Sequence, residues 1–277
     1  MKIAIFGGEG MLGTELCKIW HTAVSIPHKV ISVENVTAPV LDGFDVVINC
    51  AAYHDVDKCE HNPNRAFETN YLGPRNLAYA CRKLDIRLLH MSTNMVFNGQ
   101  QATPYATVDR CDPKTVYGYS KWLGECAILE EIAHGLSATI IRLPPIYGHA
   151  PNRGKGRNFV STVRRLAAEN KAMTFPLDQM VNPLFTLDVV ECLYWSILAE
   201  NSFGRLPIVH LGSSNSASFY EIAREILNLE GLKNPISGVF SPRGCKYPLN
   251  GVLKPSLVVP TWQESLQRYF INEPEAA

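Results

Sequence analysis

The chain has 277 residues and a mass of 30.8 kDa, enough for one large domain or two smaller ones. Hydrophobic residues make up 46% of the sequence and charged residues 19%, which is ordinary for a globular protein and excludes a disordered chain. The 26 basic residues balance 26 acidic ones, so the chain lacks the basic surface of a protein that binds nucleic acid or an anionic membrane.

The cysteines and the first residues indicate the compartment. Eight cysteines are too few for a disulfide scaffold, and none form the CxxC pairs of a zinc site. Residues 1–6 resemble the start of a signal peptide, but glycines from Gly7 onward interrupt it. No apolar run reaches the ~18 residues of a membrane span. We therefore expect a cytoplasmic protein with reduced thiols.

Short apolar runs alternate with helical patterns along the chain. We expect strands at 2–6, 45–50, 87–92, 138–143 and 208–211. We expect helices at 74–84, 120–133, 159–170, 181–198, 218–229 and 261–270, and mostly irregular chain over 235–260. Strands that alternate with helices indicate βαβ units and a parallel sheet. The expected fold is α/β, a Rossmann-type doubly wound parallel sheet with a smaller α/β substrate lobe.

The amino-acid composition changes after Leu143, where prolines and glycines become frequent. We interpret this change as the approach to a second lobe. The expected domains are a dinucleotide-binding Rossmann domain and a C-terminal substrate-binding lobe. The first would cover residues 1–150 and about 184–211, and the second residues 151–183 and 212–277.

Three glycines, Gly7, Gly10 and Gly13, follow the first expected strand and open a helix. Their first gap is one residue wider than in the GxGxxG dinucleotide fingerprint. In such a turn one glycine allows the tight bend, one lets a pyrophosphate approach the backbone, and one lets the helix pack closely. The helix N-terminus then offers N–H groups to the phosphates. Similar turns occur without ligands, but the position after an opening strand favours dinucleotide binding.

The position of the second strand decides between NADPH and NADH. A cation at its end would hold the 2′-phosphate of NADP, whereas a carboxylate would hold the ribose hydroxyls of NAD. A strand at Val24–Ile26 places Lys29 there, and a strand at Val30–Val33 places Glu34 there. The first position fits the usual distance from the glycine-rich turn better, so Lys29 is the candidate for the 2′-phosphate. The alternative for Lys29 is an ordinary solvated side chain.

Tyr117 and Lys121 stand at positions i and i+4, which places them on one face of a helix. The Lys121 ammonium can lower the pKa of the Tyr117 phenol, which is normally about 10. Such a phenol can give a proton to a carbonyl oxygen while hydride arrives at the carbon. Tyrosine and lysine are common residues, so the pair alone is a weak signal.

Two further segments that suit this proton and hydride transfer lie at the ends of expected strands, before Tyr117 in the chain. Ser92 and Thr93 end the third strand, where a hydroxyl can bond to a substrate carbonyl or to the phenol, although both are also ordinary turn residues. Ala51 and Ala52 follow the second confident strand, where a cofactor can lie against the backbone. Ligands of open parallel sheets bind at these carboxyl ends.

Together these segments resemble the extended short-chain dehydrogenase/reductase family, and within it the dTDP-4-dehydrorhamnose reductase branch. The similar stretches are 7–16, 47–60, 92–99, 116–125 and 261–266. The resemblance implies an NAD(P)-dependent oxidoreductase that transfers hydride from NADPH or NADH to C4 of a nucleotide-linked 4-keto-6-deoxysugar. A sugar nucleotide would then be its small-molecule partner.

The resemblance also implies roles for single residues. Tyr117 would donate the proton, Lys121 would assist it and bind the cofactor ribose, and Thr93 would tune the phenol or bind the sugar carbonyl. The cofactor would be lined by Gly7, Gly10, Met11, Leu12, Ala51, Ala52, Tyr53 and Asn70. The substrate would be lined by Ser92, Thr93, Asn94, Tyr117 and Asn158.

Some members of this branch bind Mg²⁺ through acidic residues at a dimer contact. Glu15 matches one of these acidic positions, and Asp188 is a second candidate, so Mg²⁺ and a homodimer are secondary expectations. Two departures fall on the sugar side of the site. Asn94-Met95 stands for the usual Asp-Tyr, and Pro145 stands for a usual tryptophan, so the identity of the sugar stays open.

Two other functions stay open as well. The regulatory β subunit of methionine adenosyltransferase resembles the same branch, keeps a Rossmann core and acts by binding a partner; residues 142–148 are similar to one of its segments. An epimerase-reductase would need a further acid/base pair, for which His149 and Cys111 are the nearest candidates. The intact threonine, tyrosine and lysine set favours the reductase.

Overall fold

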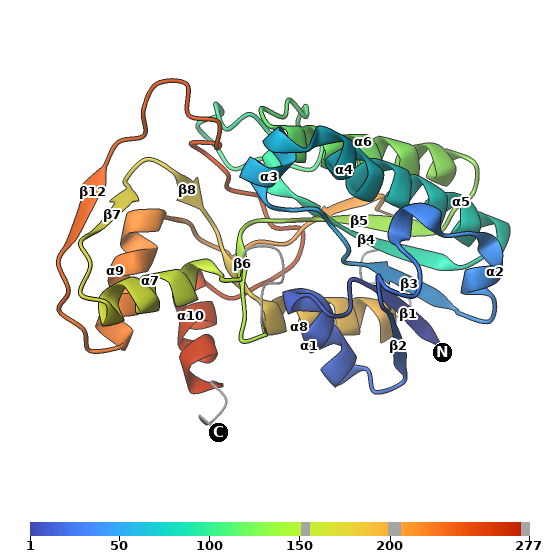
Figure 1. Cartoon of the computed structure of the whole chain (residues 1–277), viewed down its shortest axis with the longest axis horizontal. Helices are drawn as coiled ribbons and strands as arrows, with labels where there is room; N and C mark the ends of the chain where they lie inside the picture. The colour runs from blue at the N-terminus through green and yellow to red at the C-terminus, as the bar shows by residue number, and fades with distance from the viewer. Residues whose placement is uncertain (151–155, 199–205, 273–277) are drawn as a thin grey trace.

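The computed structural model describes residues 1–150, 156–198 and 206–272. A sheet of six parallel strands lies at its centre, in the order β10-β5-β4-β3-β1-β2 (Figure 1). Its strands are β1 (Ile3–Phe6), β2 (Ala23–Ile26), β3 (Val46–Asn49), β4 (Arg87–Thr93), β5 (Ala138–Leu143) and β10 (Ile208–His210). The chain reverses its direction of winding at β1 and β3, which is where such sheets bind ligands. The predicted Rossmann-type fold is confirmed.

Helices cover both faces of this sheet (Figure 1). On one face α5 (Gly73–Lys83) packs beside α6 (Val116–Ala133), and on the other α1 (Met11–Ile19) packs beside α8 (Thr186–Leu198). Shorter helical segments on the α5 and α6 side are η1 (Val33–Asn35), α2 (Ala38–Leu41), α3 (Val56–His61), α4 (Pro63–Phe67), the π-helical turn η2 (Glu68–Leu72) and η3 (Asn94–Val96).

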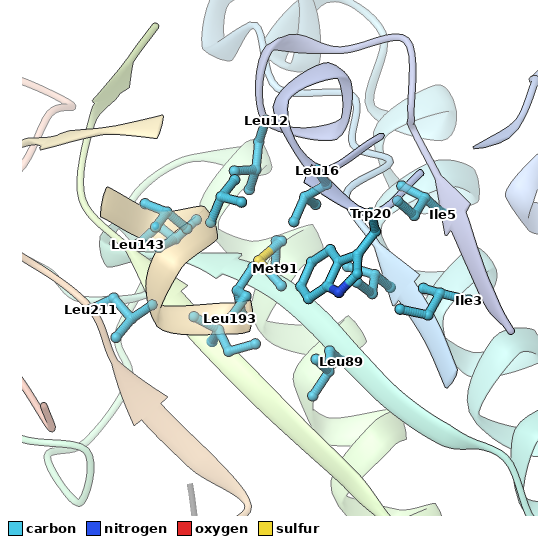
Figure 2. Packing of buried hydrophobic residues seen from close by; sticks show 14 of the residues in the cluster. Ile3, Ile5, Leu12, Leu16, Trp20, Leu89, Met91, Leu143, Leu193 and Leu211 are labelled. Carbon is cyan, nitrogen blue, oxygen red and sulfur yellow. The ribbon is translucent and has the colours of Figure 1, made fainter. Parts of the chain in front are cut away.

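Apolar side chains on alternate positions of the strands build two core clusters. Ile3 and Ile5 of β1 pack toward α1 and α8, while Ala4 and Phe6 pack toward α5 and α6. Figure 2 shows the first cluster, in which Leu12 of α1 approaches the sheet among other apolar side chains. Because both faces are buried, the strands are almost continuously apolar, as the sequence showed.

The C-terminal part of the chain forms a third apolar cluster. Its helices are α7 (Phe159–Ala168), α9 (Phe219–Leu229) and α10 (Trp262–Ile271), each opened by a capping box. Paired short strands accompany them: β6 (Ile146–Tyr147) with β9 (Leu184–Phe185), β7 (Met173–Pro176) with β12 (Ile236–Val239), and β8 (Met180–Val181) with β11 (Ala217–Ser218).

Several predicted boundaries were wrong. The helix expected from residue 181 begins at Thr186, because β8 and β9 occupy its first part. The helix expected from residue 120 begins at Val116, because the Thr115 side chain accepts a bond from the Gly118 N–H and caps it. The stretch 235–260 is mostly irregular, as expected, although it contains the short strand β12. The helices α3 and α4 were not expected. Among the helices of the described residues, none has the length and hydropathy of a membrane span.

Candidate active site

The glycine-rich turn lies at the carboxyl end of β1. Gly7 has a φ of +74°, and a Cβ atom there would lie 2.7 Å from the Ala51 nitrogen. A Cβ at Gly13 would lie 2.2 Å from the Gly7 oxygen. These glycines therefore let the turn, α1 and the loop after β3 approach one another with backbone alone. The structure thus brings Gly7 and Ala51 together, two of the predicted cofactor residues.

The N-terminus of α1 is open to a ligand. Its N-cap is Gly10, which has no side chain that could cap the first turn. A Cβ added at Gly10 would meet only the Gly7 oxygen, at 3.3 Å. Met11 and Leu12 follow with buried side chains, so mainly backbone N–H groups face outward. An uncapped helix N-terminus of this kind suits the pyrophosphate of a dinucleotide, so the residues present fit the expected cofactor.

The buried amide of Asn70 holds the loop after β3 at Tyr53. Its Oδ1 accepts a bond from the Tyr53 N–H at 2.8 Å, and its Nδ2 donates to the Tyr53 oxygen at 2.9 Å. The same Nδ2 donates to Ser120 Oγ of α6 at 3.0 Å. The π-helical turn carries Asn70 into this position. Asn70 thereby fixes the Ala51–Tyr53 loop relative to the helix that carries Tyr117.

Two glycines let α6 approach the rest of the site. A Cβ at Gly118 would lie 2.2 Å from the Met95 oxygen, and one at Gly124 would lie 2.3 Å from the Asn70 oxygen. Any larger residue at these positions would push the helix away. The glycines of the VYGYSKWLGE segment therefore set the distance between α6 and the turns η2 and η3.

Tyr117 is placed in the first turn of α6, and its side chain hydrogen-bonds to that of Thr93 at the end of β4. Burial raises the pKa of the Tyr117 phenol to about 12, although the bond with Thr93 lowers it in part. The expectation from spacing was a lowered pKa. The difference arises because the Lys121 ammonium is engaged elsewhere, so the phenol stays protonated over the whole neutral range.

Lys121 is almost completely buried, with 1% of its surface exposed. Its Nζ donates to the Met91 oxygen at 2.7 Å and lies 3.1 Å from His90 Nε2, both on β4. Burial lowers the pKa of Lys121 to about 8. The amine is therefore anchored to the strand that ends in Thr93.

The remaining hydroxyl and amide candidates on β4 and η3 are engaged inside the protein. Ser92 Oγ donates to Glu125 of α6, which forms a buried ion pair with Arg142 at 2.7 Å. Asn94 Nδ2 donates to the Gly251 oxygen at 2.8 Å and so ties η3 to the C-terminal part of the chain. The structure thus brings Thr93 to Tyr117 and places Ser92 in a separate buried network.

Asn158, the remaining substrate candidate, lies close to the cofactor turn. It caps α7, and its Nδ2 donates to the Gly148 oxygen at 2.7 Å and lies 3.8 Å from Met11 Sδ. Asn158 therefore connects the start of the C-terminal helices to the first residue of α1.

The end of β2 carries several charged groups. β2 covers Ala23–Ile26, so Lys29 follows it, as the first of the two predicted positions requires. Arg65 of α4 contacts two of them. Its Nη2 atom lies 3.4 Å from His28 Nε2, and its Nη1 atom lies 2.6 Å from Glu34 Oε1. Glu34 is thus already paired with a cation, and Lys29 is exposed.

The acidic metal candidates have other partners. Glu15 forms an ion pair with Lys18 at 3.0 Å. Asp188 is bound by Ser265 and Arg268. Over residues 1–150, 156–198 and 206–272, no group of three histidine, cysteine or acidic side chains is arranged to hold a metal ion.

The residues considered for an epimerase lie in different surroundings. His149 stacks on Tyr269 with ring centroids 4.2 Å apart, inside an aromatic cluster with Phe185. Cys111 Sγ accepts a bond from Arg142, and burial raises the pKa of this thiol to about 11.

A cleft of about 1050 Å³ lies between the segment after η3 and the C-terminal segment 241–252. Its lining includes the cations Lys114, Arg243 and Lys246. Lys246 forms an ion pair with Asp57 of α3, across 189 positions of sequence. This ion pair joins the C-terminal segment to the helix that follows the Tyr53 loop.

Several residues of the site were missed by sequence reasoning. Asn49, His90, Ser120 and Glu125 all make buried side-chain bonds to the predicted residues or to their loops. For Asn49 in β3 and His90 in β4, the available signal was a polar residue inside an apolar strand, which is costly unless it has a partner. Ser120 and Glu125 lie on the helix α6, where no such signal exists. Arg65 had no such signal, because it lies on an exposed helix.

Comparisons with known proteins agree with this geometry. The RmlD substrate binding domain family matches residues 1–273. Spore coat polysaccharide biosynthesis protein SpsK of Bacillus subtilis is 32% identical, over 86% of this chain and 82% of that protein. A dTDP-4-dehydrorhamnose reductase of Mycolicibacterium smegmatis is 35% identical, over 83% of this chain and 69% of that protein. A dTDP-4-dehydrorhamnose reductase of Bacillus anthracis, solved in complex with NADP, has a TM-score of 0.88 at 26% identity and covers 98% of each chain. The chain belongs to the RmlD substrate binding domain family.

Proposed function

We propose that this chain is an NADPH-dependent reductase of a nucleotide-linked 4-keto-6-deoxysugar, with hydride delivered to C4. The observation that carries the proposal is the protonated Tyr117 phenol, bonded to Thr93 at the carboxyl end of β4 and one helical turn from Lys121. This is where a parallel sheet of this kind places its reacting groups.

The cofactor would lie across the carboxyl ends of β1 and β3. The N–H groups at the start of α1 would hold its pyrophosphate, and the Ala51–Tyr53 loop would support its nicotinamide half. Bound there, NADPH supplies the hydride. Lys121 would hold a ribose hydroxyl, as the family resemblance implies.

The proton comes from Tyr117. As C4 of the sugar becomes an alcohol, the phenol donates its proton to the carbonyl oxygen. A pKa of about 12 keeps the phenol protonated at neutral pH, and it still lies below that of an alcohol. Thr93 holds the phenol in place and can donate to the same oxygen.

NADPH is favoured over NADH by the end of β2. Lys29 and His28 follow the strand, and Arg65 reaches the same corner. Glu34, the carboxylate that would bind the ribose hydroxyls of NADH, is paired with Arg65. The NADP present in the similar Bacillus anthracis structure supports the same choice.

The sugar nucleotide would bind beside the C-terminal segment. We propose the division into a cofactor domain, residues 1–150 and about 184–211, and a substrate lobe, residues 151–183 and 212–277, because α7, α9 and α10 pack in an apolar cluster separate from the two clusters that flank the central sheet. The cations Lys114, Arg243 and Lys246 line the cleft beside it, where they suit a diphosphate. Ser92 and Asn94, already bonded within the protein, would act there by holding their segments.

The reductase is favoured over the two alternatives. The similar proteins of Mycolicibacterium smegmatis and Bacillus anthracis are named as reductases, which supports an enzyme over a regulatory subunit. His149 and Cys111 are engaged in an aromatic cluster and with Arg142, which does not favour an epimerase. Mg²⁺ at Glu15, a homodimer and a cytoplasmic location stay predictions.

The test is a panel of nucleotide-linked 4-keto-6-deoxysugars with NADPH, in which the loss of absorbance of the reduced nicotinamide is followed. We expect turnover with at least one member, and faster turnover with NADPH than with NADH. The absence of turnover across the panel, together with a stoichiometric complex with another protein, would contradict the reductase and support the regulatory subunit.

A further inference from the structure

A chain of buried hydrogen bonds begins at the Ala51 backbone. The Ala51 N–H donates to Asn49 Oδ1 at 3.0 Å. A backbone N–H can only donate, so this bond fixes which end of the Asn49 amide is the oxygen. The Nδ2 end of Asn49 therefore faces His90 Nδ1, at 3.0 Å.

This contact determines which ring nitrogen of His90 carries the hydrogen. The Asn49 Nδ2 group can only donate, so His90 Nδ1 must accept and carries no hydrogen. Burial, followed by the nearby Lys121 charge, holds the pKa of His90 well below its usual range, so the ring is neutral. A neutral imidazole has one hydrogen, which therefore lies on Nε2.

The Nε2–H group of His90 faces the Lys121 amine. The His90 Nε2 and Lys121 Nζ atoms are 3.1 Å apart, and Nζ also donates to the Met91 oxygen at 2.7 Å. An ammonium group has only donors, so it would meet the His90 N–H donor to donor. A neutral amine has a lone pair and accepts this bond.

We propose that Asn49 and His90 are positioning residues that set the protonation state of Lys121, by presenting a fixed N–H donor that favours its neutral amine. Lys121 thereby becomes a stronger acid than an ordinary lysine. The consequence for catalysis rests on the proposed function. Neither residue is required to touch the substrate or the cofactor.

In the proposed reaction Tyr117 must regain a proton, and this arrangement can supply it from Lys121. Tyr117 loses its proton to the sugar oxygen and becomes a phenolate. The Lys121 ammonium returns a proton to the phenolate, directly or through a bridging hydroxyl, and becomes the neutral amine that accepts from His90. A proton from solvent then restores the ammonium. With pKa values of about 8 for Lys121 and about 12 for Tyr117, the transfer to the phenolate is downhill.

The other charged and titratable groups near Lys121 act in the opposite direction. Glu125 of α6 and Cys50, which follows β3, both raise its pKa, although burial dominates. Glu125 is paired with Arg142, and burial raises the pKa of the Cys50 thiol to about 12, so it stays neutral. Tyr117 lies one turn away and is neutral as well. His90 is thus the group from β4 that opposes the ammonium.

The direct test is the tautomer of His90 in the full chain. Imidazole ¹⁵N NMR on ¹⁵N-histidine-labelled protein, with His90 assigned by its absence in His90→Asn, reads which nitrogen carries the proton. We expect the Nε2–H form, unchanged between about pH 6 and 9, where an ordinary histidine loses its charge. An Nδ1–H form or an imidazolium would overturn the proposal. This readout does not depend on turnover, so it separates the proposal from the proposed function.

The second test measures Lys121. His90→Asn keeps an acceptor for Asn49 Nδ2 but removes the donor that faces Lys121. We expect the basic limb of the kcat/KM profile for sugar reduction, and the ¹³C-detected titration of the Lys121 ε-carbon, to move up by about one pH unit, a tenfold change in proton affinity. The KM for the sugar nucleotide should change little.

A matched control and a second variant make this test decisive. His210→Asn truncates another buried strand histidine, which faces Arg142 rather than Lys121, and should leave the titration of Lys121 unchanged. Asn49→Asp turns the Nδ2 donor into an acceptor, forces the proton to His90 Nδ1 and should also raise the pKa of Lys121. An unchanged Lys121 titration in folded His90→Asn or Asn49→Asp protein would overturn the proposal.

Discussion

The helix α6 side of the site and the C-terminal segment 241–252 are built in different ways. On α6, Gly118, Ser120 and Gly124 each touch a neighbouring element through a buried contact. In the C-terminal segment the cation Arg243 is exposed, and Lys246 reaches its partner from the surface. The groups proposed to transfer the proton are thus held by close packing, whereas the substrate would be bound by exposed side chains.

This difference indicates that the α6 side would carry out the proton transfer and that the C-terminal segment would select the substrate. Buried hydrogen-bonded networks hold one geometry, since each unmade bond is costly. Exposed charges contribute little each and can change without harm to the fold. Mutations on the α6 side should therefore affect kcat or stability strongly, and mutations in the C-terminal segment should affect KM mildly.

The largest effect is expected for Tyr117→Phe, which removes the proton donor. Turnover should fall by about 10²-fold or more, while NADPH binding measured by fluorescence stays the same. Tyr119→Phe is the matched control, since Tyr119 lies on the same helix, is 44% exposed and packs on Trp122. Full activity in Tyr117→Phe would refute the assignment of the proton donor.

Glu125→Ala should destabilise the chain most. The variant leaves the Arg142 charge buried without its partner, and breaking such a pair costs about 3–5 kcal/mol. Urea unfolding measures the change in free energy. The control is Glu169→Ala, which removes an exposed pair with Arg165 and should cost much less. Equal losses in the two variants would contradict the distinction between buried and exposed contacts.

Asn70→Ala should loosen the cofactor loop without removing a reacting group. Losing the bonds to Tyr53 and Ser120 should cost about 1–3 kcal/mol of stability and raise the KM for NADPH more than that for the sugar nucleotide. Steady-state kinetics with each substrate varied in turn measures the ratio. An unchanged KM for NADPH would mean that Asn70 does not hold the cofactor loop in its binding form.

Arg243→Ala tests the C-terminal segment. We expect the KM for the sugar nucleotide to rise about fivefold, since one exposed charge contributes about 1 kcal/mol, with kcat and the KM for NADPH unchanged. The difference from the native chain should shrink as salt is added. Arg224→Ala, on the outside of α9 and not part of the cleft lining, is the control. A fall in kcat with an unchanged KM would contradict the proposed binding role.

Lys29→Ala is expected to have the smallest effect. If Lys29 holds the 2′-phosphate, the KM for NADPH should rise by about threefold to fivefold while that for NADH stays the same. The comparison of the two cofactors on one variant is its own control. Equal changes for both cofactors would exclude contact with the 2′-phosphate.

The sequence predicts the α6 side of the site better than the C-terminal segment 241–252. Five of the six strands of the central sheet, and the helix α6 apart from its first turn, followed from local apolar patterns. The placement of Tyr117 and Lys121 on one helix face followed from their spacing. The raised pKa of Tyr117 could not be foreseen, because it depends on burial by residues distant in sequence. The pairs Arg65–Glu34 and Lys246–Asp57 join side chains 31 and 189 positions apart, and such distant pairs leave no local pattern.

Deuterium transfer shows directly whether the nicotinamide reduces C4 of the sugar. The experiment uses two samples of NADPH, each deuterated at the transferable position on one face of the nicotinamide ring. We expect one of the two labelled cofactors to yield a product with a single deuterium at C4 of the sugar, detected by mass spectrometry and NMR. Tyr117→Phe should form this same product at least about 10²-fold more slowly. A product without deuterium, or with deuterium at another carbon, would contradict hydride transfer to C4.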